Sequence, residues 1–164
     1  MIGTLSFTAS YAQAKKMFTE KTLPNVEVVH LNGDKVNIKE FGDNGKITII
    51  NFWATWCGPC KLELNNIADI YEEWQEDYNV ELVAVSIDDS RNAAKVRSYI
   101  NGQGWDYTIL LDANQDLKRA FSFQGPPYTV LTDQNGIIVS THSGYKNGDE
   151  YILEDKIKEL SNNK

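Results

Sequence analysis

Two kinds of hydrophobic pattern alternate along the chain and predict strands and helices in turn. Continuous apolar runs rich in β-branched residues, at 47–52 and 80–87, are typical of strands buried on both faces of a sheet. Apolar residues spaced three and four apart over 64–78 predict one long helix with a single buried face. The same spacing predicts further helices over 93–100 and 153–160.

Two turn signals of the Asn-Gly kind predict β-hairpins near the two ends of this pattern. The first separates short alternating segments at 26–31 and 35–38, and the second separates segments at 128–132 and 137–140. Both hairpins are expected to join the sheet built by the buried strands.

A strand at 107–111 and a short helix over 114–121 complete the expected elements. Strands that alternate with helices and end in a hairpin predict an α/β domain, with a central mixed β-sheet flanked by helices on both faces. No repeat or low-complexity linker divides the chain, so residues 24–164 are expected to form one domain.

Residues 1–23 are interpreted separately. Ala12-Gln13-Ala14, followed by two lysines, has the A-x-A form of a signal-peptidase site, but a basic region before the apolar residues is missing. Two interpretations stay open: the remnant of a signal peptide that begins upstream, or an N-terminal arm. The cysteine chemistry described below favours export.

The charge balance excludes one class of partner. The chain has 164 residues, with 16 Lys and Arg against 23 Asp and Glu, which gives a net charge of −7. Nucleic acids and anionic membranes are bound by concentrated positive charge, and no such cluster occurs, so no nucleic-acid partner is expected.

No apolar run approaches the ~18 residues that a membrane span requires. A monomer is expected.

The only two cysteines, Cys57 and Cys60, form a C-x-x-C pair. Such a pair can be half of a metal site, a structural disulfide or an exchanging dithiol. A metal would need two more ligands, and the only histidines, His30 and His142, show no metal-binding spacing and are expected on the surface or on an edge strand. A structural bridge across so short a loop stabilises by only about 2 kcal/mol, against about 4.7 kcal/mol for a 100-residue loop. Exchange chemistry is therefore favoured.

The position of the pair supports exchange. Cys57 follows a buried strand and opens a helix, where free backbone N–H groups and the helix dipole stabilise a thiolate. Pro59 suits the first turn of a helix because no N–H is needed there. Cys60, one turn inside, is expected to be the shielded resolving thiol.

The run from Asn51 to Cys60, NFWATWCGPC, resembles the active site of thioredoxin-like proteins, and Asn51 together with Glu63 is similar to the pattern of the TlpA and ResA group. The resemblance covers most of residues 24–162 and implies a thioredoxin-like fold. Thioredoxins carry an aspartate where this chain has Asn51. In the TlpA and ResA pattern a glutamate three residues after the second cysteine replaces it, and Glu63 matches that position. The proline that usually follows two residues later is Asn65 here.

This resemblance implies a thiol-disulfide oxidoreductase that acts as a reductant in a periplasmic or other extracytoplasmic compartment. Cys57 would form a mixed disulfide with a partner protein, Cys60 would resolve it, and Glu63 would handle the proton of Cys60. The expected partners are protein thiols or disulfides and an upstream dithiol electron donor, with a membrane tether conceivable upstream of the domain. No metal or organic cofactor is implied.

Two other functions and one other compartment stay open at this stage. A thiol peroxidase is disfavoured because Thr55 lies one residue too close to the first cysteine for a T-x-x-C motif and the proline of that motif is missing. A binding module with idle cysteines and a cytoplasmic location are the remaining alternatives.

The substrate surface is expected to include Trp56, Gly58 and Pro59. Pro127 matches the cis-proline of thioredoxin-like proteins, so the resemblance implies a cis bond between Pro126 and Pro127 and a role for both in binding. Pro126 can offer a bound peptide its carbonyl but no N–H.

Several neighbouring residues carry expectations of their own. Asp88 and Asp89 are predicted to cap a helix, and Trp53 is predicted to lie in the core while Trp56 lies at the rim. Apolar surroundings from Leu62, Leu64 and the tryptophans are expected to raise the pKa of Glu63.

Overall fold

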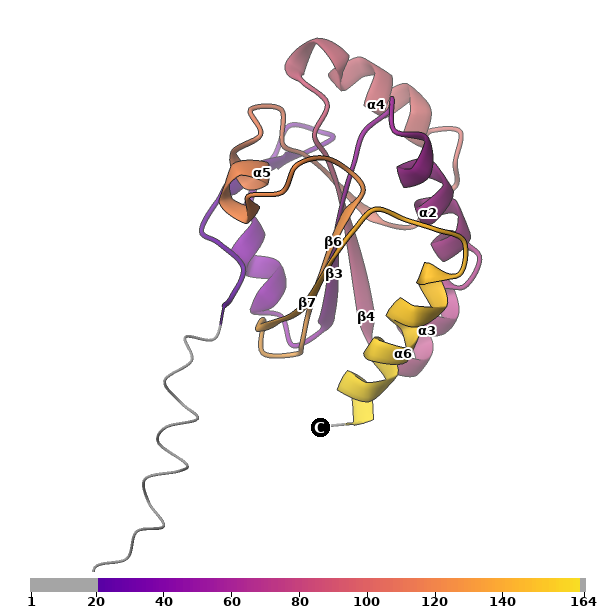
Figure 1. Ribbon diagram of the computed structural model, residues 1–164. Helices are drawn as coiled ribbons and strands as arrows, with labels where there is room; N and C mark the ends of the chain where they lie inside the picture. Colours follow the sequence, from indigo (N-terminus) through magenta and orange to yellow (C-terminus); the bar gives the residue numbers. More distant parts are fainter. Residues whose placement is uncertain (1–20, 163–164) are drawn as a thin grey trace, which may run out of the picture.

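The computed structural model describes residues 21–162 (Figure 1). Most of the expected N-terminal arm or signal remnant, residues 1–20, lies outside the described residues. The elements follow in the order β1 (Glu27–His30), β2 (Lys35–Asn37), η2 (Ile38–Gly42), β3 (Ile47–Trp53), α2 (Gly58–Ala68), α3 (Tyr71–Tyr78), β4 (Val80–Ser86), η3 (Ser90–Asn92), α4 (Ala93–Ile100), β5 (Thr108–Leu111), α5 (Asp116–Phe121), β6 (Tyr128–Thr132), β7 (Ile138–Ser143) and α6 (Asp149–Asn162).

The seven strands form one mixed sheet in the order β2-β1-β5-β4-β3-β6-β7. β3 pairs in parallel with β4, and β4 pairs in parallel with β5, whereas the outer pairs are antiparallel. The two parallel connections run through helices, and the two predicted hairpins form the edges of the sheet. The expected α/β architecture is confirmed.

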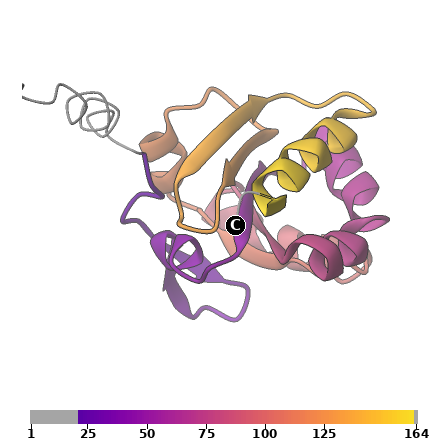
Figure 2. The same ribbon diagram turned by 90° about the horizontal axis from the view of Figure 1, so that it is seen from below.

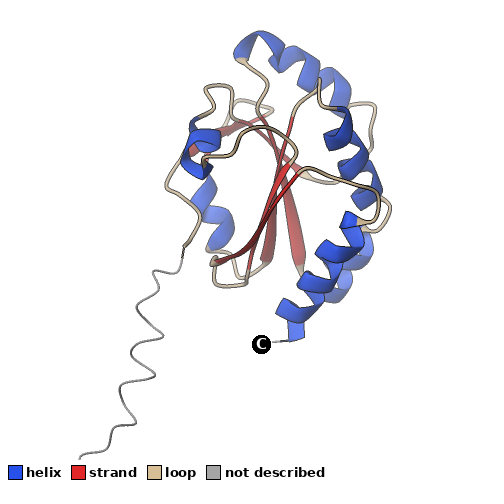
Figure 3. Cartoon of the chain, viewed as in Figure 1, coloured by secondary structure: helices blue, strands red, loops and turns tan. Residues whose placement is uncertain are grey.

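Helices cover both faces of the sheet, as predicted. Helices α2, α3 and α6 lie together on one side, and α5 and the short helix η2 lie on the other (Figures 1 and 3). The view from below shows the same two layers on either side of the strands (Figure 2). A strand at the centre of such a sheet is buried on both faces, and all seven residues of β3 are buried.

The predicted long helix is in fact two helices, which corrects the sequence-based expectation. α2 ends at Ala68 and α3 begins at Tyr71, because the backbone at Ile70 (φ −124°, ψ 1°) leaves helical geometry. The hydrophobic spacing continues in phase across the break, since Ile67, Tyr71 and Trp74 are all buried, so the pattern could not reveal it.

Residues just before the predicted domain boundary also contact the sheet. Thr22 forms an isolated bridge with Ile137, and the backbone N–H of Ile138 donates to the carbonyl of Lys21 at 2.7 Å. Leu23 is buried in the core. Residues 21–23 therefore pack against the domain.

Candidate active site

A disulfide joins the two cysteines at the start of α2. Cys57 is the N-cap residue of this helix, its Sγ accepts from the backbone N–H of Cys60 at 3.3 Å, and Pro59 lies in the first turn. Cys57 is 5% exposed and Cys60 is 0% exposed. The helix N-terminus therefore presents its free N–H groups to the first sulfur, whereas the second sulfur is enclosed.

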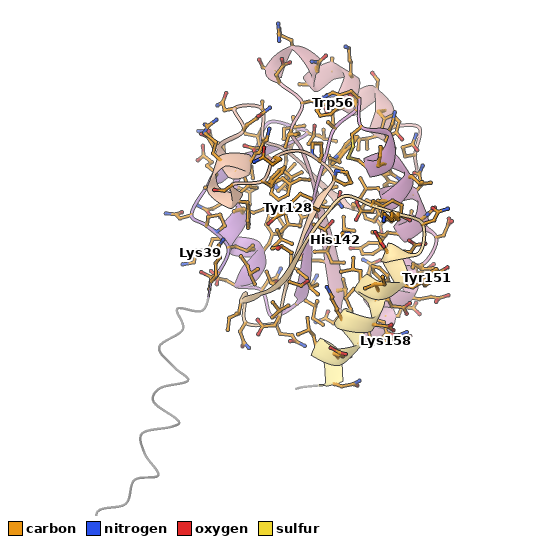
Figure 4. All side chains as sticks on the ribbon, viewed as in Figure 1. Lys39, Trp56, Tyr128, His142, Tyr151 and Lys158 are labelled. Atoms are coloured by element: carbon orange, nitrogen blue, oxygen red, sulfur yellow. A yellow bond between two sulfur atoms is a disulfide. The ribbon has the colours of Figure 1, made fainter. Side chains whose placement is uncertain are left out.

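The surroundings of the disulfide divide into a buried and an exposed side. Trp53 is fully buried and packs against Tyr99 and Trp105, with ring centroids 5.7 and 5.4 Å away. Trp56 is 66% exposed, and Figure 4 shows it near α4. The expected positions of Trp53 in the core and Trp56 at the rim are confirmed.

The peptide bond between Pro126 and Pro127 is cis, which confirms the expectation. This bond immediately precedes β6, and the Pro127 carbonyl accepts from the backbone N–H of Gly144 at 2.8 Å. The contact joins the proline loop to the end of β7.

Asp88 fixes the loop that leads into the cysteines. Its carboxylate accepts from the Thr55 backbone N–H at 2.8 Å, from the Thr55 hydroxyl at 2.7 Å and from the Ser86 hydroxyl at 2.8 Å. The predicted capping role of Asp88 is wrong, because this long-range partner takes up both carboxylate oxygens. Asp89 alone caps, accepting from the backbone N–H of Arg91 at the start of η3.

Glu63 lies one turn after Cys60 on α2 and is only 4% exposed. Its Oε1 accepts from the Thr129 hydroxyl at 3.0 Å, and that hydroxyl oxygen accepts from the side-chain amide of Asn51 at 3.0 Å. Asn51 and Thr129 are direct cross-strand partners on β3 and β6, so their side chains share the face that α2 covers. The three residues form a buried polar chain between helix and sheet.

Burial raises the pKa of Glu63 to about 7. Polar contacts from Asn51 and Thr129 lower this pKa, and the carboxylates of Asp149 and Glu150 raise it. The raised pKa was expected, but part of its expected cause is wrong. Leu62 is 45% exposed, so it does not contribute to the burial of Glu63, whereas Leu64 is fully buried as expected.

Sequence reasoning missed two partners of the predicted residues. Thr129 lies two residues after the cis-proline Pro127, but its contact with Glu63 depends on the register of β3 against β6. Asp88 contacts Thr55 across 33 positions of sequence. Threonine and aspartate side chains form hydrogen bonds, so the residue type was a signal in both cases. The spacing of residues along the sequence could not identify the bonding partner.

The described residues contain neither a cluster that could hold a metal ion nor a helix that could span a membrane. Among residues 21–162, no group of three or more His, Cys, Asp or Glu side chains is placed to hold a metal ion. Within the same range, none of the helices combines the length and apolar composition needed to cross a bilayer.

Comparison with known proteins identifies the family. Residues 19–141 match the model of the AhpC/TSA family. The chain belongs to this family. Among solved structures, this family member is similar to an uncharacterized thioredoxin-like protein from Porphyromonas gingivalis, with 42% identity and a TM-score of 0.77 over 85% of this chain and 92% of that one.

Curated relatives of this AhpC/TSA family member are named thiol-disulfide oxidoreductase ResA. The protein from Bacillus thuringiensis (strain Al Hakam) is 28% identical over 160 residues, which cover 98% of this chain and 88% of the relative. The protein from Bacillus subtilis (strain 168) is 27% identical over 143 residues, or 87% and 77% of the two chains. The thioredoxin-like fold, the resemblance to ResA and the enzyme class of thiol-disulfide oxidoreductase are thereby confirmed.

Proposed function

We propose that the protein reduces disulfides of partner proteins in an extracytoplasmic compartment, with Cys57 as the nucleophile, Cys60 as the resolving thiol and Glu63 as the proton acceptor for Cys60. The observation that carries this proposal is the buried carboxyl group placed three residues after the second cysteine. Residues at i and i+3 are neighbours on a helix surface, so Glu63 and Cys60 share the buried face of α2.

The reaction begins with the reduced dithiol. The Cys57 thiolate attacks one sulfur of the partner disulfide, which forms a mixed disulfide and releases the other partner sulfur as a thiolate. Cys60 then loses its proton to the Glu63 carboxylate and attacks Cys57 Sγ. This step forms the Cys57–Cys60 disulfide seen in the structure, releases the second partner sulfur as a thiolate and leaves the proton on Glu63. Two electrons pass from the dithiol to the partner.

Glu63 suits the proton transfer because its pKa is raised to about 7. A general base works best when its pKa lies near the working pH, since both protonation states are then accessible. An exposed glutamate with an ordinary pKa of about 4.3 would be a much weaker base toward a thiol.

The substrate surface consists of Trp56, Gly58, Pro59, Pro126 and Pro127. The exposed ring of Trp56 offers apolar contact area beside Cys57. A Cβ atom added at Gly58 would meet no atom within 4 Å, so the space above the active-site turn is open to a partner chain. Pro126 presents its carbonyl as an acceptor to an extended segment.

The direction of electron flow and the compartment rest on the similarity to the ResA group. They agree with the A-x-A motif at residues 12–14, which is typical of exported proteins. The electrons would come from an upstream dithiol donor, and protein disulfides would receive them.

The peroxidase alternative finds no support at the site. The Thr55 hydroxyl donates to buried Asp88 at 2.7 Å, so it is occupied by a structural contact. A saturable consumption of hydrogen peroxide by the reduced protein would favour the peroxidase instead.

The proposal is tested by trapping. Reduced Cys60→Ser protein mixed with a disulfide-bonded substrate protein should accumulate a covalent complex, because no resolving thiol is present. Reduced Cys57→Ser protein, the matched control, should accumulate little, since Cys60 is enclosed. Equal trapping by both variants, or by neither, would overturn the assignment of roles.

A further inference from the structure

A cavity extends from Glu63 toward the surface between β7 and α6. Its inner end is formed by Glu63 and Glu150, which are 4% and 7% exposed. At its outer end the side chains of His142 and Asp149 are 52% and 23% exposed. The centre of a water molecule can occupy a volume of about 50 Å³ in this cavity. A single water needs about 10–15 Å³ on this measure, so a few waters fit.

Strand register explains why these side chains meet. Thr129 pairs with His142 across β6 and β7, and Leu131 pairs with Ser140. Directly paired residues point to the same face of a sheet, so all four side chains line the cavity under α6. Glu63 reaches the same space from α2.

One carboxylate oxygen of Glu63 needs a partner that the protein does not supply. Oε1 accepts from Thr129, whereas Oε2 is buried and has no hydrogen-bond partner among the described residues. A buried polar atom without a partner is costly unless water reaches it, and Glu63 lines a cavity that can hold water. The cavity therefore offers room for water beside the one carboxylate oxygen of Glu63 that lacks a partner in the described protein.

The outer end of the cavity carries a group suited to proton transfer. His142 Nε2 lies 3.3 Å from Asp149 Oδ2, and an imidazole is the side chain best suited to carry protons near neutral pH. The ionisable groups that line the cavity with Glu63, or act on its charge, are His142, Asp149, Glu150, Lys156, Tyr107 and Tyr145. Of these, Lys156 donates to Ser140 and Tyr145 donates to Glu150, and His142 is the imidazole of the group, with a side chain that is half exposed at the mouth of the cavity.

We propose that Glu63 exchanges its proton with solvent through this cavity, with His142 as the proton-exchange residue at its mouth and Asp149 as the residue that positions His142. The proposal deepens the role of Glu63 given above and rests on it for its use in turnover. Figure 4 shows His142 between the strands and α6, apart from Trp56, which lines a separate groove along α4. A partner bound over Trp56 then leaves the proton path open.

The transfer moves one proton and no electrons. Protonated Glu63 gives its proton to a water in the cavity, and the water passes a proton to the imidazole of His142. The carboxylate of Asp149 stabilises the resulting imidazolium, which then releases the proton to bulk water. The water and His142 return to their starting states, and Glu63 is left as the carboxylate.

The test uses the oxidised protein without a partner, so its result does not depend on the reductant function. A light-triggered acid releases protons, and the infrared C=O band of protonated Glu63, identified by its loss in Glu63→Gln, reports how fast the carboxyl equilibrates. We expect His142→Ala to slow this equilibration about tenfold or more, and added imidazole to restore it. His30→Ala is the matched control, because it replaces the other histidine of the chain, on β1. This variant should match the wild-type rate.

Asp149→Asn keeps an acceptor for the backbone N–H of Lys146 and should slow exchange less than His142→Ala does. A wild-type rate in His142→Ala would overturn the proposal, as would a slow rate that imidazole does not restore. Neither result would affect the trapping experiment, which reports the cysteine roles alone.

Discussion

The Thr129 hydroxyl lies 3.0 Å from Glu63 Oε1 and joins the helix of the active-site cysteines to the strand that follows the cis-proline. The same hydroxyl oxygen accepts from Asn51, so its single hydrogen is directed to Glu63. Thr129 therefore stabilises the ionised carboxylate inside a site where burial disfavours it. Thr129 is one of the two side chains, with Asn51, whose polar contacts lower the pKa of Glu63 against the effect of burial.

Replacement of Thr129 by valine should therefore change both stability and titration. Loss of the hydroxyl leaves the Asn51 amide and the Glu63 carboxyl without a partner, at a cost of about 1–2 kcal/mol in the free energy of unfolding. The pKa of Glu63 should rise further, because a donor to its charged form is lost. Denaturant unfolding and a carboxyl-carbon NMR titration measure the two effects.

Thr132→Val is the matched control on the same strand. The Thr132 hydroxyl is buried and has no hydrogen-bond partner within the described part of the chain. Valine there should leave stability unchanged or raise it. Equal losses in both variants would show that the Thr129 contact has no special role.

Glu63→Gln should change how stability depends on pH. Burial raises the pKa of Glu63 from 4.5 to about 7, so the unfolded chain ionises first as the pH rises. The wild-type protein should then lose stability between about pH 4.5 and pH 7, by about 3 kcal/mol in total. The glutamine variant lacks this loss, so its free energy of unfolding should rise relative to that of the wild type across that pH range. Parallel stability curves from pH 4 to 8 would contradict the raised pKa.

Asp88 should matter much more than its neighbour Asp89. Asp88→Ala leaves the Thr55 N–H and the Thr55 and Ser86 hydroxyls without their shared acceptor, which should cost about 2–4 kcal/mol. Asp89→Ala removes a cap at the surface and should cost clearly less than Asp88→Ala. Thermal or denaturant unfolding of the two variants measures the difference. A similar cost for both variants would show that Asp88 does not hold the active-site loop in place.

The two cysteines should differ in accessibility after reduction. Cys57 lies at the helix N-terminus and keeps some exposure, whereas Cys60 has none. Brief alkylation followed by mass spectrometry should label Cys57 about tenfold faster or more. Equal labelling rates would show that the assignment of nucleophile and resolving thiol is wrong.

The sequence predicted most elements of the fold because its patterns are local. The apolar run at 47–52 became β3, and the turn at residues 134–136 joins β6 to β7. The break at Ile70 escaped prediction because a single residue leaves helical geometry while the apolar spacing continues. Hydrophobic periodicity reports which face is buried, and it is insensitive to such a local change of backbone.

The site was predicted in part, and the division has a physical basis. Cys57, Cys60 and Glu63 lie within seven residues at the start of α2. Their spacing alone therefore brings them together. Thr129, Asp88 and His142 reach their partners only through strand register or long-range contact. These long-range partners were therefore hidden until the fold was known.

The reduction potential of the Cys57/Cys60 couple, measured by equilibration in a thiol redox buffer, tests the central claim most directly. A disulfide reductant should have a potential near that of thioredoxin, about −270 mV. A value near −120 mV, typical of a strong oxidant, would contradict the proposed direction of electron flow, and a disulfide that resists excess dithiol would contradict exchange altogether.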